Sequence, residues 1–133
     1  MLIDAGPIVA LLDRTDAQHA RAKAVAADCA PPFRTCEAVL AEAAHLLANV
    51  NAAAPAGVLA LGRSGALEIA LHIDQHWRAA EKAVEKYRDV PASLADGCLI
   101  CCAEVHQEPR IFTFDADFTI YRWSRNRRFE IIG

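Results

Sequence analysis

Short apolar runs alternate with segments of helical spacing along the whole chain. Residues 1–4 form a brief apolar run that ends in an acid, and the Gly6-Pro7 pair after it suits the first turn of a helix. The predicted strands are residues 1–4, 33–35, 67–71, 110–114 and 129–132. The predicted helices are residues 7–12, 16–27, 39–49 with Thr35 as a cap, 53–63, 74–87 and 93–105.

Strands separated by helices predict crossover connections and a parallel sheet covered on both faces, which is the α/β class. The chain has 133 residues, of which 54% are hydrophobic, so one core suffices and residues 1–133 are expected to form a single domain. No apolar run approaches membrane-spanning length, and the first residues lack a signal-peptide pattern. We therefore expect a cytoplasmic protein without membrane contact.

Cysteine usage and net charge restrict the function classes. Five cysteines is an odd number, and three of them crowd into residues 98–102, so reduced thiols are expected rather than a disulfide framework. The net charge of −3 argues weakly against a general polyanion binder. That charge includes several acids that stand at candidate metal-binding positions, and bound cations would neutralise them.

Two acids directly follow predicted strands. Asp4 follows the first strand and Asp115 follows residues 111–114, and in open parallel sheets functional groups gather beyond the carboxyl ends of strands, where the strand order reverses. Each acid has a structural alternative. Asp4 could serve only the turn before Gly6, and Asp115 or Asp117 could cap a helix that starts near residue 116.

Two further acids lie on predicted helices. Ser93 and Asp96 have the spacing of a capping box, so Asp96 could be a cap. Glu42 lies among apolar helical residues, where an unpaired buried carboxylate costs several kcal/mol. Glu37 is five positions away and therefore on a different helix face, where it suits an exposed place near the helix start. We therefore predict that Glu42, and not Glu37, is the inward acid.

Convergence of such carboxylates would require a cation, because like charges otherwise drive protonation or destabilise the fold. A pocket of carboxylates without His or Cys suits a hard divalent ion such as Mg²⁺. The chemistry predicted from it is phosphodiester cleavage by metal-activated water, with either one ion or two. The absence of a Gly-rich turn after the first strand argues against dinucleotide binding, and Gly6 stands where an aspartyl phosphatase would carry a second Asp.

Four acidic motifs follow one another along the chain: residues 4–13 from Asp4, 35–42 ending in Glu42, 94–100 around Asp96, and 111–118 around Asp115 and Asp117. Together they resemble PIN-domain ribonucleases, particularly the VapC-like toxins. The resemblance implies a PIN-like three-layer fold, Mg²⁺ or Mn²⁺ at the acids, endonucleolytic cleavage of RNA, and a cognate antitoxin. It assigns metal binding to Asp4, Glu42, Asp96 and Asp115, with Asp117 as an auxiliary ligand or a substitute for Asp115.

The chain departs from the family pattern at two places. The spacing between Asp115 and Asp117 is short, which leaves open which of them is the ligand. Position 97 is Gly where Ala is commoner, which predicts a looser helix behind Asp96.

Two other clusters along the chain have residue types that could serve a function. The arginines at 122, 125, 127 and 128 form the only dense basic cluster, and Arg122 and Arg125 are candidates for binding RNA phosphates, against the alternative of a solvated turn. Cys98, Cys102 and His106 share one helix face but fit a core better than a transition-metal site.

A non-enzymatic interpretation also remains open. The same fold could act as a non-catalytic binding module, with the acids retained as caps. The helical segments 38–47 and 58–61 carry more apolar surface than one small sheet can cover, which predicts a homodimer or a bound peptide under either interpretation.

Overall fold

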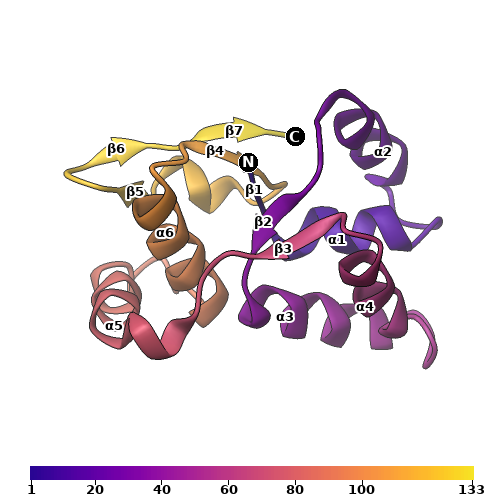
Figure 1. Ribbon diagram of the computed structural model, residues 1–133, viewed down its shortest axis with the longest axis horizontal. Helices are drawn as coiled ribbons and strands as arrows, with labels where there is room; N and C mark the ends of the chain where they lie inside the picture. The colour runs from indigo at the N-terminus through magenta and orange to yellow at the C-terminus, as the bar shows by residue number, and fades with distance from the viewer.

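The computed structural model describes all 133 residues and places five parallel strands in one sheet (Figure 1). Every neighbouring pair in this sheet is parallel, which confirms the predicted α/β class with a central parallel sheet. In order across the sheet, the strands are β3 (Leu67–Ile69), β2 (Phe33–Thr35), β1 (Leu2–Ile3), β4 (Arg110–Phe112) and β7 (Glu130–Ile132).

Six α-helices flank the sheet, each at a place where helical spacing predicts one. In Figure 1, α5 and α6 gather to the left of the strands and α1, α2 and α4 to the right, while α3 packs against both α1 and α6. No helix combines the length and the apolar character that a membrane crossing requires. The bounds are α1 (Ala5–Leu12), α2 (His19–Asp28), α3 (Glu37–Ala48), α4 (Ala56–Arg63), α5 (Trp77–Lys86) and α6 (Leu94–His106).

The strand order reverses between β1 and β4, the two central neighbours. From β1 the chain proceeds outward to β2 and β3, then crosses back to β4 and continues outward to β7 on the other side. Both central strands are fully buried at Leu2, Ile3, Ile111 and Phe112. The acids that follow these strands are therefore carried on the best-packed part of the sheet.

Helix α6 forms much of the core. Eight of its 13 residues are buried, among them Cys98, Cys101 and Cys102. His106 lies at its end, where Nε2 is 2.7 Å from the carbonyl oxygen of Ala70, which fixes the proton on that nitrogen because a carbonyl only accepts. The burial of Cys98 and Cys102 confirms the prediction that they are core residues.

Several details differ from the sequence expectation. Thr35 does not cap α3, because it ends β2 and its hydroxyl donates to the carbonyl oxygen of Ile3 at 3.2 Å, which leaves Cys36 at the cap position. The predicted helix 74–87 is divided into a 3₁₀ turn, η1 (Ile73–Gln75), and α5. The segment after Asp115 is a 3₁₀ turn, η2 (Ala116–Thr119).

The arginine-rich segment forms an antiparallel hairpin that the sequence pattern does not predict. Its strands are β5 (Arg122–Trp123) and β6 (Arg127–Arg128). The loop residues Ser124, Arg125 and Asn126 all have positive φ, and none of them is Gly. The turn therefore lacks the glycine signal by which such loops are usually recognised.

Gly97 lies where α6 approaches α5 closely. A Cβ atom at this position would lie 2.7 Å from Cγ2 of Val84 and 3.4 Å from the carbonyl oxygen of Ala80. Val84 is β-branched and has few rotamers into which it could retreat. The glycine thus permits the close helix contact behind Asp96, rather than only loosening the helix as expected.

We predict that Gly97→Ala lowers the free energy of unfolding by about 1 kcal/mol. Overpacking costs about 1–3 kcal/mol, and the better helix propensity of Ala returns only about 1 kcal/mol. Gly62→Ala in α4 is the matched control, since its Cβ would meet nothing within 4 Å and the substitution should stabilise. Urea unfolding measures both variants, and a stabilised Gly97→Ala protein would contradict this account of the contact.

Candidate functional site

Four acids from four separate parts of the chain line one hollow at the carboxyl ends of β1 and β4. The hollow has a volume of about 340 Å³. Asp4 and Asp115 follow the two central strands, while Glu42 comes from α3 and Asp96 from the first turn of α6. The remaining lining residues are Ala5, Gly6, Leu46, Ser93 and Phe114.

Asp4 is the most buried of these acids, with 7% of its surface exposed. Its Oδ1 accepts the backbone N–H of Ala5 at 2.7 Å, and its Oδ2 accepts the hydroxyl of Thr113 at 2.7 Å. Burial raises the pKa of Asp4 to about 6, although these two hydrogen bonds act to lower it. The charges of Asp96 and Glu42 act in the same direction as burial.

Thr113 ties the two strand-end acids together. While its hydroxyl donates to Asp4, its Oγ1 accepts the backbone N–H of Asp115 at 2.9 Å. Thr113 is itself almost fully buried, at 1% exposed. A fully satisfied buried hydroxyl of this kind fixes the orientation of the groups that it joins.

Asp96 is held by the start of its own helix and by a tyrosine from a distant segment. Its Oδ2 accepts the N–H of Ser93 at 2.7 Å, and the Ser93 hydroxyl accepts the N–H of Asp96 at 3.1 Å, which completes the predicted capping box. The buried hydroxyl of Tyr121 donates to the same Oδ2 at 3.3 Å. Burial and the charge of Asp115 raise the pKa of Asp96 despite these hydrogen bonds.

Glu42 reaches the hollow from α3 with no hydrogen-bond partner for its carboxylate. The sequence predicts a buried carboxylate here, but the residue is exposed, because its side chain faces the hollow rather than the neighbouring apolar residues. Partial burial, followed by the charges of Asp96 and Asp115, raises its pKa. Glu37 is exposed and does not line the hollow, as its different helix face predicts.

The sequence presents helix capping and a shared pocket as alternative roles for the acids, but in the structure the same acids do both: they bond to helix starts and line one hollow. Asp4 caps α1, Asp96 completes the capping box that Ser93 opens at α6, and Asp115 caps η2 by accepting the N–H of Asp117 at 2.8 Å. Each cap occupies part of a carboxylate whose other lone pairs remain available. The caps thereby orient the acids toward a common space.

The donor set of the hollow fits a hard divalent cation. All four acidic side chains offer oxygen, as Mg²⁺ and Mn²⁺ prefer, and the raised pKa values of three of them reflect buried or mutually repelling charge. No three His, Cys, Asp or Glu side chains are already arranged closely enough to hold an ion. Binding therefore requires the freer side chains, Glu42 and Asp115, to close on the ion or to reach it through water.

Three other candidate residues lie outside the lining of the acidic hollow. Asp117 donates its backbone N–H to Asp115, and its charge contributes to raising the pKa of Tyr121. Arg122 donates from Nη1 to the carbonyl oxygens of Thr119, Ile120 and Tyr121, where it terminates η2. Arg125 lines a second hollow together with residues of α5 and α6.

Sequence reasoning missed two residues that contact the acids. Thr113 could have been recognised as a polar position in a buried strand end two residues before Asp115, because such a hydroxyl needs a partner. Tyr121 is not among the site residues that the sequence predicts. No local pattern connects it with Asp96, which lies 25 positions earlier in the chain.

We predict that the metal-free chain loses stability as the pH rises from about 4 to about 6, and that Asp4→Asn flattens this profile. An acid whose pKa rises on folding, from 3.8 to about 6 here, binds more protons in the folded state, so its ionisation opposes folding. At pH 8 in EDTA, the variant should gain on the order of 1–3 kcal/mol, since one pKa unit equals about 1.4 kcal/mol.

Urea unfolding between pH 4.5 and 8 measures this effect. Glu108 provides the internal contrast: burial opposes its ionisation, but hydrogen bonds from Arg110 and the N-terminus lower its pKa from 4.5 to about 2. Its contribution is present above pH 4.5 and is lost as the pH falls toward 2, outside the range of the experiment. Parallel profiles for the wild type and Asp4→Asn would contradict the assignment.

Comparison with known proteins identifies the family and the fold. A family model described as the PIN domain matches residues 1–123. Among solved structures, the fold is similar to that of VapC20 of Mycobacterium tuberculosis, described as a sarcin-ricin loop cleaving toxin, with a TM-score of 0.78, 20% sequence identity, and coverage of 90% of this chain and 92% of that chain. No curated protein matches the chain. Because the family match extends from the first strand through β5, the chain belongs to the PIN-domain family.

Proposed function

We propose that this protein is a divalent-metal-dependent endoribonuclease that acts in the cytoplasm as the toxin of a toxin-antitoxin pair. The observation that carries the proposal is the gathering of Asp4, Glu42, Asp96 and Asp115 in one hollow at the strand-order reversal. Membership of the PIN-domain family supports it, as does a fold shared with a toxin that is described as cleaving the sarcin-ricin loop.

In this proposal, the four acids hold Mg²⁺ or Mn²⁺, and Asp117 is an auxiliary ligand that could move toward the ion from the start of η2. A bound ion of this kind supplies an activated water and stabilises negative charge on the leaving oxygen. The chain's own groups prepare the site. Thr113 orients Asp4, Tyr121 and Ser93 orient Asp96, and the cap of η2 orients Asp115.

The ionisation of Asp4 sets the range in which the site can act. With a pKa of about 6 in the absence of metal, Asp4 is mostly ionised at neutral pH and mostly protonated at pH 5. A protonated carboxyl is a poor ligand, so metal binding should release a proton in mildly acidic solution. When no ion is bound, protonation of Asp4 also reduces the repulsion between its carboxylate and those of Asp96 and Glu42.

The alternative is a non-catalytic PIN-fold module that acts through protein contacts. Apolar side chains remain exposed on α4, on α3 and in the turn after α3, with Leu59 72%, Leu46 42% and Val50 46% exposed. We propose that such surface serves a homodimer or a cognate antitoxin, whose inserted Arg or Lys would meet the acids. A homodimer or an antitoxin complex is compatible with both the ribonuclease and the non-catalytic module, so neither partner distinguishes the two functions.

A cleavage assay separates them. We predict that the wild-type chain cuts RNA with Mg²⁺ or Mn²⁺, and that Asp4→Asn and Asp96→Asn each reduce the rate by more than about 100-fold, beyond the effect of losing an outer partner of a metal ligand. Glu42→Gln and Glu37→Gln form a matched pair on α3, and only Glu42→Gln should reduce the rate. Cleavage that survives EDTA and both Asp substitutions would remove the metal-nuclease function.

A binding measurement tests the role of Thr113 independently of turnover. We predict that Thr113→Val weakens Mn²⁺ binding, measured by calorimetry, by about 10–100-fold, because Asp4 and the backbone of Asp115 lose their common partner. Thr119→Val is the control, since that exposed hydroxyl donates only to the carbonyl oxygen of Ala116. Equal Mn²⁺ affinity in the two variants would show that Thr113 does not position the ligands.

A further inference from the structure

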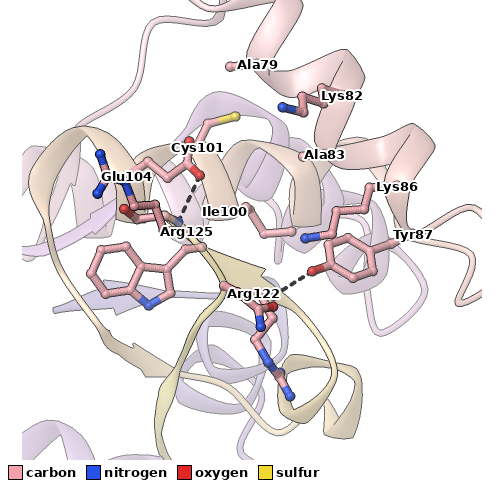
Figure 2. Close-up of a pocket in the computed structure, with 13 residues that line it drawn as sticks. Ala79, Lys82, Ala83, Lys86, Tyr87, Ile100, Cys101, Glu104, Arg122 and Arg125 are labelled. Atoms are coloured by element: carbon pink, nitrogen blue, oxygen red, sulfur yellow. Dashed lines mark hydrogen bonds between the residues drawn. The ribbon is translucent and has the colours of Figure 1, made fainter.

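A second hollow lies between α5, α6 and the loop of the β5–β6 hairpin (Figure 2). Its volume is about 390 Å³. The sides are formed by the last turns of α5 and by Ile100, Cys101 and Glu104 of α6, and loop residues 124–126 close one end. None of its lining residues belongs to the acidic hollow.

Three cations face this hollow from two different elements. Figure 2 shows Lys82 and Lys86 projecting from α5 toward it, and Arg125 comes from the hairpin loop. None of the three forms a salt bridge, because the ion pairs of the structure involve only the N-terminus, Arg34 and Arg110 as cations. The Lys86 ammonium lies 5.0 Å from the ring centroid of Tyr87, which favours its position beside the hollow.

The other charged residues that line the hollow have partners of their own. Glu104 accepts the N–H of Ser124 at 2.9 Å, which attaches the hairpin loop to α6. The Arg122 guanidinium bonds to the end of η2 and points away from the lysines in Figure 2. Three cations against one carboxylate leave the lining of the hollow with an excess of positive charge.

The aromatic residues at the hollow are not free to stack on bases. Trp123 is 2% exposed, and its Nε1–H donates to the carbonyl oxygen of Arg128. Tyr87 is 8% exposed, and its hydroxyl accepts the N–H of Arg122. The hollow therefore offers charge without a stacking platform, a combination that suits phosphate rather than base recognition.

The two hollows share the same helix. Asp96, Ile100 and Glu104 follow one another at four-residue spacing along one stripe of α6, and the eight positions from the first to the last correspond to about 12 Å. The acidic hollow repels a polyanion, particularly in a chain of net charge −3. An RNA strand that reaches the acids must therefore gain attraction from nearby cations.

We propose that Lys82, Lys86 and Arg125 bind the phosphate backbone of the RNA strand whose scissile bond lies at the acidic hollow. This inference rests on the proposed ribonuclease function. The contact is independent of base sequence, and it acts equally on bound substrate and on the transition state. Loss of these cations therefore raises KM and leaves kcat unchanged.

The test compares Lys82→Gln/Lys86→Gln with Lys23→Gln/Arg63→Gln, a control that removes the same charge from α2 and α4. Binding of a labelled single-stranded RNA is measured in EDTA over a range of salt concentrations. Each lost phosphate contact lowers the salt slope by about 0.7, so the hollow variant should lose about 1.4 from its slope and bind about 20-fold more weakly at 0.1 M salt. The control variant should remain within about twofold of the wild type, because its removed charges lie outside the proposed RNA path.

Cleavage kinetics provide a second measurement that a folding defect would not imitate. A dinucleotide has one phosphodiester and cannot occupy both hollows, so the hollow variant should cleave it like the wild type and show a raised KM only on longer RNA. If RNA affinity falls equally in the hollow variant and the control variant, or in neither, the inference is overturned, while cleavage by the wild type still supports the nuclease function. Unchanged RNA binding together with lost binding of an acidic peptide would assign the hollow to a protein partner and also overturn it. A wild type that binds RNA through the hollow but never cuts it would instead refute the proposed function.

Discussion

Burial of carboxylate charge at the junction of β1 and β4, to which repulsion among the acids adds, is the constraint on which the rest of the site depends. Asp4 is nearly buried there, with Asp96 and Glu42 close enough to raise its pKa further. Water cannot fully solvate this charge, and no Lys or Arg lines the hollow to neutralise it. The fold thus keeps a local instability beside its buried central strands, which a bound cation would remove.

The polar groups around the acids limit that instability without cancelling it. Hydrogen bonds from Thr113 and Ala5 favour the ionised form of Asp4, and Ser93 and Tyr121 do the same for Asp96. Apart from Tyr121, these donors lie at a helix start or directly after a strand, so the same bonds fix secondary structure and site geometry. Rigid donors beneath the carboxylates leave the opposite lone pairs directed at the hollow, which is the preorganisation that a metal site needs.

The sequence predicts much of the fold because strand ends, helix spacing and cap residues are local signals. Asp4, Asp96 and Asp115 could be placed because each follows a strand or begins a helix, and Glu42 because only one of two acids could face inward. The contacts that orient them could not be predicted, since the Tyr121–Asp96 bond joins residues 25 positions apart. The β5–β6 hairpin was missed because its loop, Ser124 to Asn126, adopts positive φ without glycine.

The second hollow, between α5, α6 and the β5–β6 loop, also could not be predicted from the sequence. The sequence directs attention to the dense arginines, yet Arg122 is occupied by three carbonyls and Arg127 lies over the Trp123 ring. The cations that line the hollow without an anionic or carbonyl partner are Arg125 and two lysines of α5, and no sequence motif indicates the lysines. Charge density along a chain measures what is nearby in sequence, whereas an RNA strand responds to charge that is nearby in space and not already neutralised. Helix α6 brings the two hollows close together in space, because it carries Asp96 at its start and lines the second hollow one to two turns later.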